Sequence, residues 1–480
     1  MGNTAIWKRP ALCALGLILT LCACGDDDAS ATCRPTDASS CATGLSCEQV
    51  GDSGYECLPP VIVSGRVVGA LDGVGIAGAT IVGLDANGAA RTRVARSGAA
   101  GAYELPVSVA RNADRTPRTE AITLRVAASA YEPFPTAPRS ALPIELQRAQ
   151  RHTAAATANT YRVEHAATTV ALLPRPVAER GGATIEGTLA GGSPAGALIA
   201  AVIGERAAST AVADRDGAFV LFNVPAGSVR IEGYRAGLAV TPRTVELPTT
   251  GLTGVTLAGA TAPVSRVGGK VNVVNPGSGS TTSVILALAS TFDANTARGE
   301  APAGLRAGNV SGDFSIEGVP PGRYAVLAAF ENDFLVRDPD MSIAGTDIVF
   351  VTVPATGAAV TLEQSFKVTG ALDVVSPGAQ GVEEVTAGPL MLRWADDSSE
   401  DGYELRVYDA LGTLVHEERS VPRVTGGGNV SYVLDTSDAT KYPAGMILQF
   451  RATSYSTTPQ GARTYLSSTE DLKGVFQMKR

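Results

Sequence analysis

Cysteines are the residues of this 480-residue chain whose type and spacing point most directly to chemistry. Four of the seven fall in one short stretch with the spacing C-x7-C-x5-C-x9-C, namely Cys33, Cys41, Cys47 and Cys57. In an exported chain, an even number of cysteines packed this closely indicates two disulfides, and all three pairings stay open. The competing zinc interpretation lacks close C-x-x-C pairs and a nearby histidine. We therefore expect a disulfide-stapled module and no metal.

The first segment indicates export. The basic pair in "WKRP" precedes the apolar run "ALCALGLILTLCAC", which ends at Cys24. This run is shorter than the roughly 20 residues of a membrane-spanning helix and fits the apolar region of a signal peptide. Its end, Leu-Cys-Ala-Cys, resembles the bacterial lipobox, which implies a signal peptide over residues 1–23 and a lipid on Cys24. Cys22 fits less well, because a bulky leucine precedes it, and an ordinary secretory leader cut nearby is the alternative.

Histidines offer little catalytic or metal-binding chemistry. His152, His165 and His416 are the only three, none has the spacing of a metal ligand pair, and they fall in two different predicted domains. Neither H-E-x-x-H nor G-x-S-x-G occurs. We expect no catalytic residue, no metal and no cofactor.

One acidic stretch, Asp397-x-Ser399-x-Asp401-Gly, has the opening of a calcium loop, with oxygen ligands at positions 1, 3 and 5 and a glycine at position 6. Position 12 is Tyr408, so the bidentate glutamate of such loops is missing. A short acidic turn between strands explains the same residues, and calcium binding stays open at this point.

Composition favours turn-rich β structure. Glycine (53) and proline (28) are abundant, and 45% of the residues are hydrophobic, enough to form several cores. The formal charge is −8 and no basic run occurs, which argues against a nucleic-acid partner.

Three segments repeat one order of strands and turns. Each starts with an apolar-x-Gly-x-apolar strand, continues with a second apolar strand, and then has a Gly-x-aromatic strand whose aromatic side chain is expected to point inward. The second and third copies next turn through Val-Pro-x-Gly, where proline presets φ and glycine relieves the turn. The central glycines and the aromatics are, in order, Gly65, Gly187 and Gly269, and Tyr103, Phe219 and Phe314.

These repeats resemble carboxypeptidase-regulatory-like domains, which are transthyretin-type (prealbumin-like) sandwiches of exported bacterial proteins. The name denotes an accessory domain and brings no peptidase activity. The first copy lacks the Pro-x-Gly turn and carries a long insert over 111–151, and the third has an insert around "ASTFDANTARGEAPAG". The expected domains are a signal peptide (1–23), a tether and Cys-rich module (24–60), three sandwiches (61–176, 180–260, 263–364) and a terminal domain (366–480).

The terminal domain resembles a fibronectin type III domain, an immunoglobulin-like sandwich. The resemblance rests on Trp394, on Tyr403 and on the Phe450-Arg-Ala stretch, whereas Leu448 stands where the family usually has a tyrosine. Trp394 could serve as a sugar-stacking platform only if it were exposed, and a place in the core is the preferred interpretation.

Together these features predict an all-β chain of tandem antiparallel sandwiches, anchored to the bacterial envelope by a lipid. The outer membrane or cell surface is preferred to the inner membrane. We expect a non-catalytic binding and spacer protein whose copies close their own cores and stack end to end, with an envelope protein or polysaccharide as partner. The alternatives are a carbohydrate-binding protein resembling starch-binding folds and, last, a divergent hydrolase.

Overall fold

The computed structural model describes residues 33–35, 40–136, 141–151, 160–260, 262–274, 282–293, 299–329, 348–470 and 473–479. Within these ranges the regular structure is β-strand with a few one-turn 3-10 helices, so the predicted all-β fold is confirmed. No helix in the described part of the chain has the length and apolarity needed to cross a bilayer. The 3-10 helices are η2 (Leu146–Arg148), η3 (Ala166–Thr168), η4 (Val177–Glu179) and η5 (Ala289–Thr291).

A small hairpin and a first sandwich occupy the N-terminal part of the described chain. The hairpin pairs β1 (Ser46–Val50) with β2 (Gly54–Leu58). In the first sandwich, one sheet is built around the long central strand β3 and the other around β4, and a cluster of buried aliphatic side chains fills the space between them. Its strands are β3 (Val61–Gly69), β4 (Thr80–Leu84), β5 (Ala95–Arg96), β6 (Ala102–Val107), β7 (Ala121–Ala127), β8 (Ile144–Glu145), β9 (Gln150–Arg151), β10 (Tyr161–Val163) and β11 (Val170–Leu172).

The third sandwich repeats this two-sheet plan, whereas the strands of the second are linked into one continuous eight-stranded sheet. The second comprises β12 (Ala183–Ala190), β13 (Leu198–Ile203), β14 (Arg206–Val212), β15 (Ala218–Val224), β16 (Gly227–Arg235), β17 (Leu238–Thr241), β18 (Arg243–Leu247) and β19 (Leu252–Ala260). The third comprises β20 (Ser265–Val274), β21 (Thr282–Leu288), β22 (Arg306–Val310), β23 (Asp313–Val319), β24 (Gly322–Ala329), β25 (Ile348–Val353), β26 (Val360–Thr361) and β27 (Phe366–Thr369).

The terminal sandwich packs a three-stranded sheet on a six-stranded sheet. Its core contains Trp394 and Tyr403, whose ring centroids lie 5.6 Å apart. Trp394 has no exposed surface, so the predicted core position is confirmed and the side chain cannot stack on a sugar. The strands are β28 (Val374–Ser376), β29 (Glu383–Val385), β30 (Pro389–Ala395), β31 (Gly402–Asp409), β32 (Leu414–Pro422), β33 (Asn429–Asp435), β34 (Ile447–Thr457), β35 (Arg463–Ser468) and β36 (Val475–Met478).

The three copies share one strand topology. In each, the first strand pairs antiparallel with the Gly-x-aromatic strand and parallel with strands from the end of the copy. These first strands are β3, β12 and β20. Each central glycine lies directly opposite the aromatic residue of the hairpin strand: Gly65 opposite Tyr103, Gly187 opposite Phe219, and Gly269 opposite Phe314.

Close approach explains why this position is glycine. A Cβ atom added to Gly187 would lie 2.5 Å from the Phe219 ring and 2.4 Å from the Val255 carbonyl oxygen. At Gly65 the corresponding distances are 2.9 Å to the Tyr103 hydroxyl and 1.9 Å to the carbonyl oxygen of Thr168. The glycine therefore lets the inward aromatic ring and a neighbouring backbone carbonyl come close to the first strand.

The predicted insert of the first copy is smaller than we expected. β7 lies inside 111–151 and pairs with β4, as β16 pairs with β13 and β24 with β21 in the other copies. It is thus a regular strand of the sandwich. We did not predict this strand from the sequence, because a longer connection stands before β7 in place of the Pro-x-Gly turn that precedes the equivalent strand in the other copies.

The expectation that each copy closes its own core is wrong. β13 directs Ile199 and Ala201 into the core of the second sandwich, while Leu198, Ala200 and Val202 belong to the core cluster of the third. The sequence "LIAAVI" is apolar on both faces, and such a strand must be covered on both faces. The second and third copies therefore share β13, which lies between their two apolar cores and contributes side chains to both.

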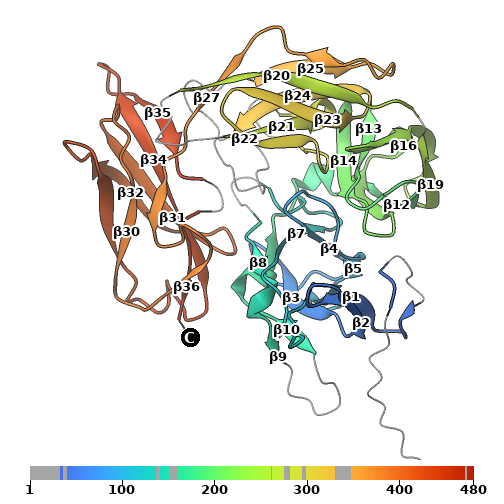
Figure 1. The fold of residues 1–480 in the computed structure, drawn as a ribbon, viewed down its shortest axis with the longest axis horizontal. Helices are drawn as coiled ribbons and strands as arrows, with labels where there is room; N and C mark the ends of the chain where they lie inside the picture. Colours follow the sequence, from blue (N-terminus) through green and yellow to red (C-terminus); the bar gives the residue numbers. More distant parts are fainter. Residues whose placement is uncertain are drawn as a thin grey trace, which may run out of the picture.

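Polar contacts join the first sandwich to both of the others. Arg125 on β7 donates two hydrogen bonds to the Glu300 carboxylate, at 2.8 and 2.7 Å, and a third to the Thr210 hydroxyl at 2.9 Å. Since Arg125, Thr210 and Glu300 come from the first, second and third copies, the three sandwiches meet at this point. Figure 1 shows the first sandwich (blue to teal) below the third (yellow to orange). The second sandwich (green) lies to the right of these two and the terminal sandwich (red-orange) to their left. This arrangement differs from the end-to-end row that we expected.

Candidate functional site

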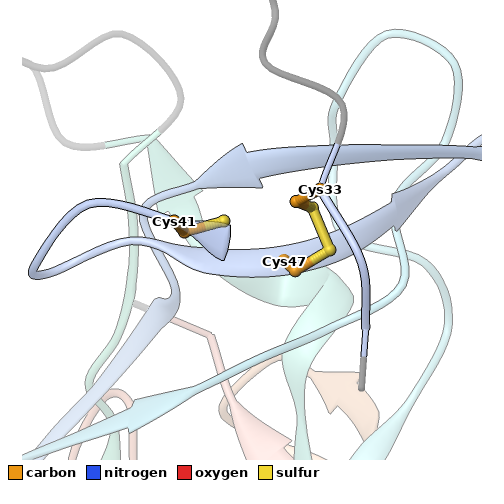
Figure 2. Close-up of side chains that lie close together, drawn as sticks. All are labelled: Cys33, Cys41 and Cys47. Carbon is orange, nitrogen blue, oxygen red and sulfur yellow. A yellow bond between two sulfur atoms is a disulfide. The ribbon is translucent and has the colours of Figure 1, made fainter. Parts of the chain in front are cut away.

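The cysteine module is held by two disulfides. Cys33 is bonded to Cys47 and Cys41 to Cys57, with S–S distances of 1.98 and 2.01 Å, which selects one of the three pairings left open by the sequence. Figure 2 shows the Cys33–Cys47 bond with Cys41 beside it. The sulfur atoms of Cys33, Cys41 and Cys47 lie within 4.8 Å of one another, a spacing that could suit a metal. Because these sulfurs are bonded in disulfides, they are not thiolate ligands. Cys24 and the leader lie outside the described residues.

A buried ion pair docks this module on the first sandwich. The Glu48 carboxylate on β1 and the Arg111 guanidinium have no exposed surface and form a close ion pair. Arg111 also donates to the carbonyl oxygen of Pro59 at 2.6 Å, and the Val109 amide donates to Glu48 at 3.2 Å. Burial raises the pKa of Glu48, while the charge of Arg111 and the hydrogen bonds that Glu48 accepts from Arg111 and the Val109 amide act in the opposite direction. The module is thus a fixed part of the first sandwich.

The two described histidines make local contacts within their own sandwiches. His165 caps η3, where its Nδ1 atom accepts a hydrogen bond from the Ala167 amide at 3.2 Å. His416 on β32 lies 2.9 Å from the Tyr432 hydroxyl, and burial lowers its pKa. His152 lies outside the described residues. In the described part of the chain, the three cysteines are the only group of metal-type ligands within reach of one ion.

The acidic Asp397 loop uses its oxygens within the terminal sandwich. Asp397 accepts hydrogen bonds from the Ser399 hydroxyl at 2.9 Å and from the Ser454 hydroxyl at 2.7 Å. Asp401 accepts from the Thr457 amide at 2.6 Å. These bonds favour the acidic-turn interpretation, because the side chains fix the loop to β34 instead of pointing at a common centre.

A cleft of about 870 Å³ lies between the first and terminal sandwiches. Its two apolar lining residues, Val163 and Met478, are only 3% and 2% exposed. The other lining residues are polar or charged: Arg148, Gln150, Arg151, Arg162, Glu164 and His165 on the first sandwich, and Glu384, Gln477 and Lys479 on the terminal sandwich. A cleft of this volume suits a medium-sized ligand, and its lining favours a polar one.

The elements of both sandwiches fix these side chains. On one side, β9 pairs with β10, and η3 follows β10. The Thr168 carbonyl oxygen of η3 accepts a 2.7 Å hydrogen bond from Tyr103, the aromatic residue of the first repeat. On the other side, β29 pairs with β36 in parallel, and the Lys479 amide donates to the Val385 carbonyl oxygen at 2.9 Å. Tyr103, the inward aromatic residue of the first copy, therefore also helps to position one wall of the cleft.

Arg148 bridges the two walls. It forms a close ion pair with Glu145 of its own sandwich, donates to the Val382 carbonyl oxygen at 2.7 Å, and lies 3.8 Å from the Glu384 carboxylate. Arg162 is held within the first sandwich by Glu104 and the Ser64 hydroxyl, both at 2.6 Å. Arg148 thus connects the two walls of the cleft, and Arg151 and Lys479 are among the exposed residues of its lining.

Sequence reasoning missed the cleft. Its residues come from segments more than two hundred positions apart, and none forms a motif. The long insert was the available signal, because three of the lining residues lie in it, at 148, 150 and 151, and four more follow shortly after it, at 162–165.

Comparisons with known proteins show β-sandwich neighbours at low similarity. No protein-family model and no curated protein matches the sequence. Among solved structures, the Bacillus anthracis TIE protein is similar over 90% of this chain and 73% of its own, at 9% identity and a TM-score of 0.16. A streptococcal ancillary pilin covers 64% of this chain and 98% of its own, at 10% identity and a TM-score of 0.16. A Bacteroides uniformis protein described as carbohydrate binding covers 45% and 99%, at 11% identity and a TM-score of 0.22. At these TM-scores the likeness carries no argument about function.

Proposed function

We propose that this chain is a non-catalytic, lipid-anchored protein of the bacterial cell envelope that binds a polar partner in the cleft between its first and terminal sandwiches. Cys24 carries the lipid, and the outer membrane or cell surface is the preferred location. The regulatory-like and fibronectin-like domains are accessory modules, and no cofactor takes part.

The observation that supports this function is the cleft itself. Two separate sandwiches contribute polar side chains to it, and Arg148 contacts both walls. Binding sites commonly occur where two domains meet. The docked cysteine module and the joined sandwiches make the proposed spacer a single mount, which holds the first sandwich, and with it one wall of the cleft, in a fixed place relative to the cysteine module.

The anchor and the cleft can be tested in one experiment. The chain produced in bacteria should partition into a detergent phase, and Cys24→Ser should move it into the aqueous phase, since stable anchoring needs acyl chains. The aqueous Cys24→Ser protein is then added to delipidated envelope material, with and without Gln150→Trp, which puts a bulky side chain into the cleft. We expect the tryptophan to reduce retention about tenfold or more, equivalent to about 1.4 kcal/mol of binding free energy.

Thr244→Trp is the matched control, because Thr244 is exposed on β18 of the second sandwich, away from the cleft. Equal retention of the Gln150→Trp and Thr244→Trp proteins would refute the cleft as binding site. Detergent partitioning by Cys24→Ser would refute the lipid assignment. Release of small products from the envelope material would refute the non-catalytic assignment and support the divergent hydrolase.

A further inference from the structure

The two walls of the cleft belong to units with separate cores. The core of the first sandwich draws on residues between Val61 and Leu172, and that of the terminal sandwich on residues between Leu372 and Met478. No apolar cluster among the described residues combines side chains of both. The second and third sandwiches differ, because β13 contributes to both of their cores. The terminal sandwich can therefore change its position without exposing its own core.

The covalent link to the terminal sandwich is short. β27 pairs in parallel with β20 of the third sandwich and ends with Thr369 opposite Val274. The next residue, Gly370, already contacts the terminal sandwich, since its carbonyl oxygen accepts a hydrogen bond from the Ser467 hydroxyl. The chain thus passes from one unit to the other at the bond between Thr369 and Gly370. Glycine tolerates a wide range of backbone dihedral angles, which suits a hinge at this position.

The contact that Arg148 makes between the two walls is polar and partly exposed. Its guanidinium donates to the Val382 carbonyl oxygen at 2.7 Å and lies 3.8 Å from the Glu384 carboxylate. The side chains of Arg148 and Glu384 are 37% and 56% exposed, so water and salt screen this pair. Arg125, which connects the first three sandwiches, is only 9% exposed. A small polar contact such as that of Arg148 leaves two domains free to move relative to each other.

We propose, on the basis of the function proposed above, that the terminal sandwich moves as a rigid body about a hinge at Gly370 and closes the cleft on its ligand. The first three sandwiches are the fixed body, because they share apolar clusters and a largely buried arginine. Arg148 is a positioning residue that holds the cleft at the opening of this structure. A ligand that contacts both walls stabilises a more closed position, and hinge closure of this kind is common where two domains bind one ligand.

Distances between two spin labels test the hinge in the full-length chain in detergent micelles. The labels are placed at Gln150→Cys and Lys479→Cys, which are exposed and lie on opposite walls. We expect Arg148→Ala to broaden the distribution of distances and to shift it to longer values. Arg162→Ala is the matched control and should leave the distribution unchanged, because Arg162 is held by Glu104 and Ser64 of its own sandwich.

A second pair of labels, outside the cleft, tests closure on the ligand. These labels are placed at Leu71→Cys on the first sandwich and Thr413→Cys on the terminal sandwich, both exposed. Delipidated envelope material should narrow the distribution of distances for this pair. A pair at Leu71→Cys and Thr244→Cys lies within the fixed body and should respond neither to envelope material nor to Arg148→Ala.

Each alternative outcome has a separate meaning. An unchanged distribution across the cleft in Arg148→Ala would overturn the hinge, and envelope retention still sensitive to Gln150→Trp would then leave the proposed function standing. An equal shift in Arg162→Ala would overturn the role of Arg148, and broadening of the Leu71–Thr244 pair would overturn the fixed body. Retention on envelope material without narrowing of the Leu71–Thr413 pair would overturn closure on the ligand. Absence of retention would overturn the proposed function itself.

Discussion

Arg111 is the residue through which the cysteine module is joined to the first sandwich. Its guanidinium has no exposed surface and pairs with Glu48, which is also fully buried. A buried pair of this kind contributes little net stability compared with an apolar pair, but loss of one partner leaves a buried charge without compensation. The pair therefore fixes the docking geometry more than it adds free energy.

Arg111→Gln should lower the free energy of unfolding by about 3–5 kcal/mol at neutral pH. The arginine opposes the rise in the pKa of Glu48 caused by burial, so its removal raises that pKa further. Glu48 with a raised folded-state pKa loses stability as it ionises, so the deficit should grow as pH rises through the already raised folded-state pKa of Glu48 in the unsubstituted chain, and shrink in acid. Urea unfolding at pH 4 and pH 7 measures this.

Arg115→Gln is the matched control for that variant. Arg115 pairs with Glu56 of the same module at 2.8 Å, but its side chain is 43% exposed, and such pairs are worth less than about 1 kcal/mol. A deficit of equal size in both variants, or one that does not change with pH, would contradict the assigned role of Arg111.

Each repeat depends on one feature of its first strand, a glycine that faces the aromatic residue of the paired strand. The same arrangement recurs on β3, β12 and β20, although the residues around it differ. The three copies therefore share a steric arrangement, in which an inward aromatic ring packs over a residue that has no Cβ atom.

Gly187→Ala should destabilise the second sandwich by about 1–3 kcal/mol, the usual cost of overpacking, because the new methyl group would meet the Phe219 ring and the Val255 carbonyl oxygen. Phe219→Leu in the same chain should recover only part of this loss, since the backbone contact remains. Chemical denaturation measures both. Gly181→Ala is the control, as nothing lies within 4 Å of a Cβ atom there. Unchanged stability of Gly187→Ala would show that the strand moves freely and that the glycine is not required.

At the scale of the molecule, the three repeats form one joined body. Alternate faces of β13 contribute to two cores, and Arg125 connects all three copies through Thr210 and Glu300. Little independent motion of these copies is expected, because separation would expose apolar side chains as well as a largely buried arginine.

Val202→Asp tests this joined body. Val202 is 2% exposed and lies in the core cluster of the third sandwich, so a carboxylate there should separate the second and third copies. We expect a larger radius of gyration by small-angle scattering and two thermal transitions in place of one. Ile203→Asp, at the next position and 39% exposed, should change neither. A compact Val202→Asp protein with a single transition would contradict the shared core.

The order and identity of the strands could be predicted from the sequence, because they depend on local patterns. Alternating apolar residues, Gly-x-aromatic strands and Val-Pro-x-Gly turns predicted the three copies, and the strands begin and end close to these signals. Trp394 was correctly placed in a core by the same logic. The disulfide-bonded module followed from cysteine spacing, although spacing alone could not select Cys33–Cys47 and Cys41–Cys57.

Only the tertiary structure decided how the copies meet and where a ligand can bind. The second apolar face of β13 was visible in "LIAAVI", but the sequence does not say which neighbour covers it. The cleft depends on Arg148 reaching Val382, a contact between residues more than two hundred positions apart. Such contacts leave no local pattern, since they arise from the packing of whole sandwiches and not from the periodicity of any one strand.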